Sequence, residues 1–330
     1  MPELLSPTTL RGLVASYESY CVRRGRAAGT LRQYRPVLDS LVVWAGGRDP
    51  RSLTAADIEM EWLRFWCEQF QSRRGRPPAP KTLRNTLTAV KSLFSFCERY
   101  GFITPNPAAG IEMPRVEPRF NDWLAPDEDA AIIAACRSPQ ERIVVPMLRF
   151  AGLRAGELIL LLKGDVDLTK GAILVRHSKT PRGRRTIPIV PELAPFIEAW
   201  VRIQTTLGHG SKASAFLCTR AGGPMGYAQA YDTVKRVATR AGVRRRLPPD
   251  REGVNTTEVS PHTLRRTFGS SLLNQGVRLE VVSRLLGHES TVTTERSYAS
   301  LLDSTIAAEV LDVLPRDPHV PHRTFNPPLT

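Results

Sequence analysis

The first 112 residues show the apolar spacing of amphipathic helices. Apolar residues recur at intervals of three and four in successive segments that begin near Thr9, Gly29, Thr54 and Pro80. Threonine, glycine or proline stands where these segments start or stop, as expected at helix ends. We therefore predict a four-helix bundle over residues 1–112.

The helical pattern stops between residues 104 and 121, where four prolines occur. We expect an extended linker at residues 113–121. A second domain then spans residues 122–313, and the proline-rich residues 314–330 form a tail.

Helical segments also dominate residues 122–313. Their apolar residues follow helical spacing from Pro126 onward, from residue 140 to Gly152, and over residues 192–202, 226–241 and 260–298. Two short apolar runs, 173–175 and 186–189, indicate strands around a turn at Pro181–Gly183. Residues 244–258 are polar and are expected to form a loop. The fold class is therefore mainly α with a small β component (α+β).

Side chains suited to phosphate chemistry gather in the stretch Ser260–Tyr298. His262 and Arg265 are three residues apart and share one face of a helix. His288 follows in Leu-Gly-His, and Tyr298 comes ten residues later. An arginine binds a phosphate group, and a phenol is a nucleophile that can attack it.

Two further basic residues allow more than one interpretation. Arg154 follows a glycine at a helix start, where it either pairs with Glu157 or faces an anion. Lys179 leads into the predicted turn of the hairpin, where a basic tip is either solubilising surface or a source of a proton in a groove. Three arginines compete with Lys179 for that role: Arg182, Arg184 and Arg185.

The net charge of +14 indicates a polyanionic partner, most simply a nucleic acid. Basic residues cluster in the loops at 23–26 and 73–81 and continue along one helix at Lys81, Arg84 and Lys91. This is the pattern of an arm that grips a DNA backbone, although a solvated face gives the same pattern. The five cysteines have no paired spacing, so we expect reduced thiols, and with neither a secretory signal nor a membrane span we expect a cytoplasmic protein.

The residues at six positions, with the motifs around them, resemble the motifs of the tyrosine recombinase (phage integrase) family. The matching motifs are GLRAGEL, SKTPRGRRTIPI, HTLRRT, LLGH and TTERSY, which contain Arg154, Lys179, His262, Arg265, His288 and Tyr298. The motifs occur in the family's order. Arg266 departs from the histidine that many members have there, at a position without a catalytic role. The other tyrosines and histidines lack these surroundings, and we expect Tyr227 and Tyr231 in the core.

The resemblance implies a mechanism and an architecture. Arg154, Arg265 and His288 would hold the phosphate, Tyr298 would attack it, His262 would act as base or donor, and Lys179 would protonate the leaving 5′-oxygen. The helical front domain would be a SAM-like core-binding domain that forms a C-shaped clamp on DNA with the catalytic domain. No metal, ATP or other cofactor is expected.

The resemblance also implies how the protein assembles. A helix over residues 301–314 would dock on a neighbouring copy, giving a homotetramer on two paired DNA sites, with a related recombinase or accessory protein as possible further partners. The short stretch before Thr8 favours a Xer-like or mobile-element recombinase without an arm-binding domain. Two alternatives stay open from the sequence: a type IB topoisomerase and a catalytically silent DNA-binding protein.

Overall fold

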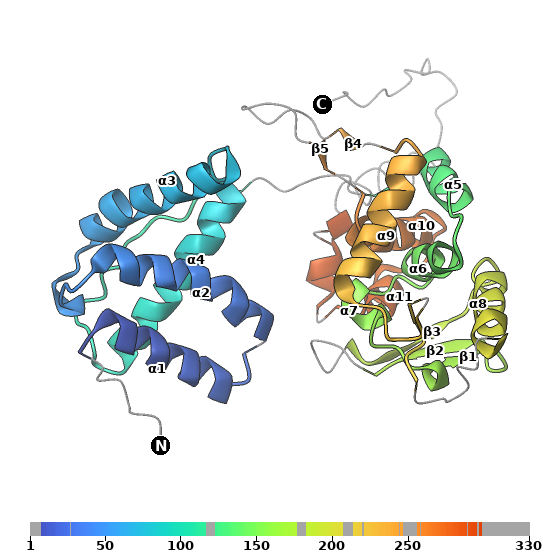
Figure 1. The fold of residues 1–330 in the computed structure, drawn as a ribbon, viewed down its shortest axis with the longest axis horizontal. Helices are drawn as coiled ribbons and strands as arrows, with labels where there is room; N and C mark the ends of the chain where they lie inside the picture. The colour runs from blue at the N-terminus through green and yellow to red at the C-terminus, as the bar shows by residue number, and fades with distance from the viewer. Residues whose placement is uncertain are drawn as a thin grey trace, which may run out of the picture. The chain divides into compact units, whose positions relative to one another are not determined.

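The protein is described here from a computed structural model (Figure 1). The structure describes residues 8–26, 28–116, 123–176, 183–206, 214–219, 221–243, 245–246, 256–257, 259–288, 290–295 and 297–298. The predicted Lys179, the predicted helix at 301–314 and the tail lie outside the described residues. The chain divides into two compact units between Pro118 and Arg119, a point inside the expected linker.

The first unit contains the predicted helices. Its elements are α1 (Leu10–Arg23), α2 (Ala28–Ala45), η1 (Pro50–Ser52), η2 (Asp57–Trp62), α3 (Leu63–Arg74) and α4 (Pro80–Arg99). Thr9 caps α1 by accepting a hydrogen bond from the Gly12 N–H at 3.1 Å. Helices α1, α2 and α4 pack on one another around a buried apolar core.

The third predicted helix differs in one respect, since its first part, η2, is a π-helix. Its two buried residues, Ile58 and Trp62, are four apart. That spacing keeps two side chains on one side in either helix type, so the apolar pattern does not separate them.

Two of the three basic residues on α4 that are expected to grip DNA contact backbone carbonyls of their own unit. The Lys91 ammonium donates to the carbonyls of Ala109 at 3.0 Å and Ile111 at 2.9 Å, and the Arg84 guanidinium donates to the Pro114 carbonyl at 3.2 Å. These two cations hold the segment after α4 against the helix. Of these three basic residues, Lys81 has no such backbone contact among those that the structure describes.

The second unit is built around α6 (Pro139–Phe150). Its other helices among the described residues include α5 (Pro126–Ala134), α7 (Ala155–Leu158), η3 (Lys163–Asp165), α8 (Ala194–Thr206), α9 (Tyr227–Arg240), α10 (Pro261–Asn274) and α11 (Leu279–Leu286). Helix α6 contacts α5, α7, α8, α9 and α10, and lies among them in Figure 1. Its residues 143–148 are all buried, as expected for a helix surrounded by others.

A three-stranded antiparallel sheet lies beside these helices, in the order β1 (Val166–Asp167), β2 (Ala172–Val175) and β3 (Arg185–Pro188). Ile173 pairs with Ile187, and both face the core. The expected hairpin is therefore present, and β1 is an addition to it. A second addition is the pair β4 (Arg245–Arg246) and β5 (Thr256–Thr257), in the segment expected to be a loop. Strands of two residues are too short to show alternation.

The mainly α fold with a small antiparallel sheet confirms the predicted fold class. All five cysteines are free, and Cys67 alone among them is only partly buried. Among the described helices, none has the length and apolar character needed to cross a membrane.

Candidate active site

Arg154 lies where α6 turns into α7. Gly152 ends α6 with a positive φ of 59°, and the Phe268 ring of α10 fills the space where its side chain would stand, 2.3 Å from an ideal Cβ. The Glu157 carboxylate accepts hydrogen bonds from the Arg154 backbone N–H at 2.9 Å and from its Nη1 at 2.7 Å. The pairing with Glu157 is therefore present. The Arg154 side chain is still 37% exposed, so it is also open to an external anion.

Arg265 lies on the buried face of α10, and its side chain is 2% exposed. Ser260 caps this helix by accepting from the Thr263 N–H at 3.3 Å. The Arg265 guanidinium donates to the Gly152 carbonyl at 2.6 Å and to the Leu286 carbonyl. Burial and the nearby Arg154 charge lower the pKa of Arg265 to about 9, against the opposing effect of Glu157.

Glu157 is the common partner of three arginines. Its carboxylate oxygens lie 2.7 Å from Arg154 Nη1, 3.0 Å from Arg185 Nη2 and 3.7 Å from Arg265 Nη1. Burial by itself would raise the pKa of Glu157, but the hydrogen bonds and charge of Arg185 and Arg154 lower it to about 2. Glu157 is therefore an anion at neutral pH that holds the arginines together.

The same three arginines bind the end of α11. The Leu285 carbonyl accepts from Arg185 Nε at 2.5 Å, the Leu286 carbonyl from Arg265, and the Gly287 carbonyl from Arg154 Nη2 at 3.1 Å. These are carbonyls that a helix end leaves without helical partners, at the negative end of its dipole. The arginines thus fix α11 and the glycine after it.

His288 follows directly. Gly287 ends α11 with a positive φ of 61°, so the chain turns at that residue. The His288 Nδ1 lies 2.7 Å from the Thr294 hydroxyl oxygen. Burial and the positive charges of Arg265 and Arg154 together lower the pKa of His288 to about 4. The ring is therefore neutral at neutral pH.

Tyr298 is 1% exposed. Its phenol donates a hydrogen bond to the Arg266 backbone carbonyl at 3.3 Å, and its ring lies 6.2 Å from that of Trp123. Burial raises the pKa of Tyr298 to about 12, while the charges of Arg265 and Arg266 oppose the rise. The phenol is therefore protonated in this state of the protein.

The structure brings five of the six predicted site residues into one region. The charges of Arg265, Arg154 and His262 act on His288, the charge of Arg154 acts on Arg265, and that of Arg265 acts on Tyr298. His262 is exposed in the first turn of α10. The sixth residue, Lys179, lies outside the described residues.

The sequence reasoning missed two contributors, Arg185 and Thr294. The sequence presents Arg185 only as a competitor of Lys179, whereas its guanidinium is 7% exposed and bound to Glu157. Thr294 belongs to the TTERSY motif and is fully buried, but no local pattern pointed to His288 as its partner. Both contacts join residues whose proximity depends on the tertiary fold.

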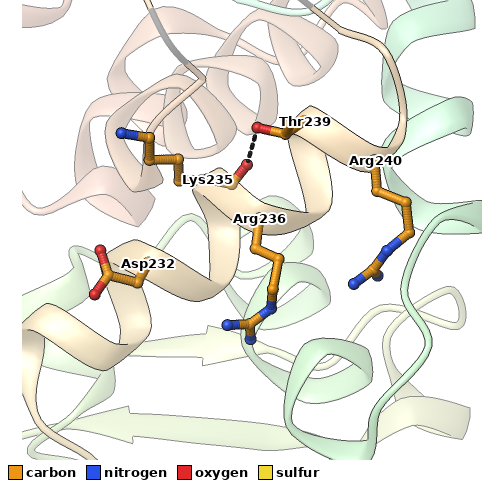
Figure 2. Close-up of a pocket in the computed structure, with 5 residues that line it drawn as sticks. All are labelled: Asp232, Lys235, Arg236, Thr239 and Arg240. Carbon is orange, nitrogen blue, oxygen red and sulfur yellow. Dashed lines mark hydrogen bonds between the residues drawn. The ribbon is translucent and has the colours of Figure 1, made fainter.

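The expectation for Tyr227 is wrong, because this tyrosine is 56% exposed at the start of α9. Figure 2 shows a pocket of about 520 Å³ farther along the same helix, lined by Asp232, Lys235, Arg236, Thr239 and Arg240. Arg236 and Arg240 pair there with the buried Glu141 at 3.0 and 2.9 Å. None of the five described site residues lines this pocket. Within the described ranges, no three histidine, cysteine or acidic side chains gather as metal ligands.

The geometry agrees with a comparison to known families. The model of the phage integrase family matches residues 122–305, more than half of the 330 residues. The chain belongs to the phage integrase family. The match covers Arg154, His262, Arg265, His288 and Tyr298, and it confirms the resemblance to tyrosine recombinases.

Members of this family are similar over most of the chain. Tyrosine recombinase XerC of Xanthomonas campestris pv. campestris is 27% identical over 278 residues, which cover 83% of this chain and 79% of XerC. Tyrosine recombinase XerD of Ralstonia nicotianae is 26% identical over 297 residues, which cover 88% of this chain and 90% of XerD.

Solved structures share the fold at 19% identity. The Tn1549 transposon integrase in complex with transposon right end DNA has a TM-score of 0.68, and the match covers 91% of this chain and 99% of that one. The lambda integrase tetramer bound to a Holliday junction has a TM-score of 0.65, with 86% and 78% covered. The fold is therefore that of an integrase.

Proposed function

We propose that this phage integrase family member is a site-specific DNA recombinase that acts through a 3′-phosphotyrosine intermediate. One observation carries the proposal: Arg154 and Arg265 share the Glu157 carboxylate and the end of α11, beside His288 and Tyr298. Paired arginines suit a phosphodiester whose negative charge increases during attack. The proposed target is duplex DNA in the cytoplasm.

Cleavage begins with the phosphate held by Arg154 and Arg265. The Tyr298 oxygen then attacks phosphorus, the bond to the 5′-oxygen breaks, and a 3′-phosphotyrosine forms. His262 accepts the phenol proton or donates a hydrogen bond to the phosphate. His288, whose ring is neutral, donates a hydrogen bond to a phosphate oxygen. Rejoining reverses these steps and conserves the phosphodiester bond energy, so no ATP is consumed.

The leaving 5′-oxygen needs a proton, and we assign Lys179 as its source by resemblance to the family. The phenol is buried and protonated before DNA binds, with a pKa of about 12. DNA binding therefore has to expose Tyr298 and bring a proton acceptor to it.

We further propose a homotetramer on two paired sites, joined through residues 301–314. The solved tetramer of lambda integrase on a Holliday junction supports such an assembly for a related fold. Integration, excision and dimer resolution all use the same strand-exchange chemistry.

Covalent trapping tests the proposal. Nicked fragments of host DNA are incubated with the protein and denatured in SDS, and the attached DNA is sequenced, with Tyr298→Phe as control. We expect one enriched sequence with the wild type and none with the variant. Attachment at all sequences would indicate a topoisomerase, and no attachment would indicate a silent DNA-binding protein.

A further inference from the structure

Arg185 is a buried cation outside the predicted set of site residues. It is the first residue of β3, paired with Val175 of β2, and its side chain is 7% exposed. A buried charge is costly unless it is paired and hydrogen-bonded. Its partners therefore indicate why an arginine stands there.

Four hydrogen bonds use almost all of the Arg185 fork. Nε donates to the Leu285 carbonyl at 2.5 Å, and Nη1 donates to Glu157 Oε1 at 3.2 Å and to the Gly183 carbonyl at 2.9 Å. Nη2 donates to Glu157 Oε2 at 3.0 Å. An arginine has five N–H donors, so these contacts leave a single one.

This arrangement differs from that of the two proposed phosphate-binding arginines. Arg154 is more than a third exposed, and Arg265 donates to Gly152 and Leu286 while it stays within ion-pair distance of Glu157. Both depend on Glu157 and on the end of α11 for their orientation. Arg185 binds both of these supports at once.

We propose that Arg185 is a positioning residue, which orients Arg154 and Arg265 toward the phosphate by fixing Glu157 and the carboxyl end of α11. The inference rests on the proposed function, because it assigns those arginines to a phosphodiester. Arg185 itself does not contact the phosphate. Its contribution appears only when charge on the phosphate has to be stabilised.

The space around Gly287 supports the same conclusion. An ideal Cβ at Gly287 would lie 2.8 Å from Arg185 Nη1 and 3.2 Å from the Gly183 Cα. The guanidinium therefore fits closely between the chain at Gly183 and the turn that precedes His288. A lysine has one compact donor group and does not reproduce these planar contacts.

The test compares two substitutions that each remove an arginine from a buried carboxylate. Arg185→Gln breaks the pair with Glu157. Arg176→Gln breaks the ion pair that Arg176, the residue after β2, makes with Asp165 of η3; among the described residues, neither partner pairs with Arg154, Arg265, His288 or Tyr298. Arg185→Lys keeps the charge and removes the fork. Thermal melting and DNA affinity are measured for each variant, so that unfolded protein is recognised.

Single-turnover cleavage is then measured on the trapped site with two scissile groups. One is the natural phosphodiester, and the other is a methylphosphonate, in which a methyl group replaces a charged non-bridging oxygen. We expect Arg185→Gln to slow phosphodiester cleavage about 100-fold, as for a misplaced catalytic geometry. The methylphosphonate reaction needs less charge stabilisation, and we expect it to slow less than about 10-fold.

Arg176→Gln should leave both rates near those of the wild type, and Arg185→Lys should resemble Arg185→Gln. Equal slowing on both substrates would overturn the proposal, because it would indicate a general loss of structure. Recovery of Arg185→Gln on a 5′-bridging phosphorothioate would also overturn it, because it would place the defect at the leaving group. A wild-type protein that attaches to no DNA would instead refute the proposed function.

Discussion

The phenol oxygen of Tyr298 occupies the space where a side chain at Gly269 would begin. An ideal Cβ at Gly269 would lie 2.0 Å from that oxygen and 2.5 Å from the Tyr298 Cζ. Gly269 is a helical residue of α10 without a positive φ, so its backbone does not require glycine. The requirement comes from the tyrosine, whose buried position depends on the missing side chain.

Gly269→Ala should therefore displace Tyr298. We expect the phenol to become more reactive toward a tyrosine-modifying reagent, and stability to fall by about 1–3 kcal/mol from overpacking. Peptide mapping by mass spectrometry and denaturant unfolding measure the two effects. Gly29→Ala, in α2 with open space around it, is the control; it should leave the Tyr298 reactivity unchanged and should not lower stability. An unreactive Tyr298 in the Gly269 variant would contradict the expectation.

Thr294→Val should weaken catalysis through His288. Valine keeps the shape of threonine but cannot bond to His288 Nδ1, so the ring loses the group that fixes its orientation and tautomer. We expect cleavage to slow by about 10-fold, within the range for lost orienting partners, with DNA affinity nearly unchanged. Thr294→Ser keeps the hydroxyl and should stay close to the wild type. Equal rates for valine and serine would exclude this role.

The lowered pKa of His288 predicts a loss of stability in mild acid. Its pKa is about 4 in the folded protein against an ordinary 6.5, so the unfolded chain binds the extra proton first. Stability should therefore decrease as the pH falls from 6.5 toward 4. His288→Gln removes this contribution, so its stability should change less over the same window. Urea unfolding at several pH values measures the difference, and parallel curves would contradict the assignment.

Glu157→Gln should be among the most destabilising single changes in the second unit. It removes the anion that three arginines share and leaves the buried Arg265 without a compensating charge, at a cost of about 3–5 kcal/mol. Asp165→Asn is the matched control, because its buried carboxylate pairs with Arg176, which is 55% exposed. Denaturant unfolding should show the smaller loss for Asp165→Asn, and the reverse order would refute this account of Glu157.

Substitutions of Lys81 and Lys91 on α4 should affect the salt dependence of DNA binding differently. Lys81→Gln is expected to reduce the slope of log affinity against log salt by about one phosphate contact. Lys91 donates to backbone carbonyls, so Lys91→Gln should leave that slope unchanged and lower the melting temperature instead. A lower slope for Lys91→Gln would show that this residue also binds a phosphate.

Sequence reasoning found the features that depend on local spacing. Helical periodicity located α4, α6 and α10, and motif order selected Arg154, Arg265, His288 and Tyr298, which the structure brings into one region. It did not find Arg185, because the contact that explains this residue reaches Leu285, 100 positions away. The backbone contacts of Lys91 could not be predicted from the sequence for a different reason. Its partners are backbone carbonyls, which have the same chemistry at every residue and leave no mark in the sequence.

The hydrogen bonds at the end of α11 determine where this domain can accept an inserted residue. Three consecutive carbonyls, at residues 285–287, each accept from an arginine on a different element. One residue added within α11 would rotate the helix end by about 100° and shift it by about 1.5 Å, so all three bonds would be lost together. An insertion scan should therefore find acceptable sites between α10 and α11, at residues 275–278, and none from Leu279 to Gly287.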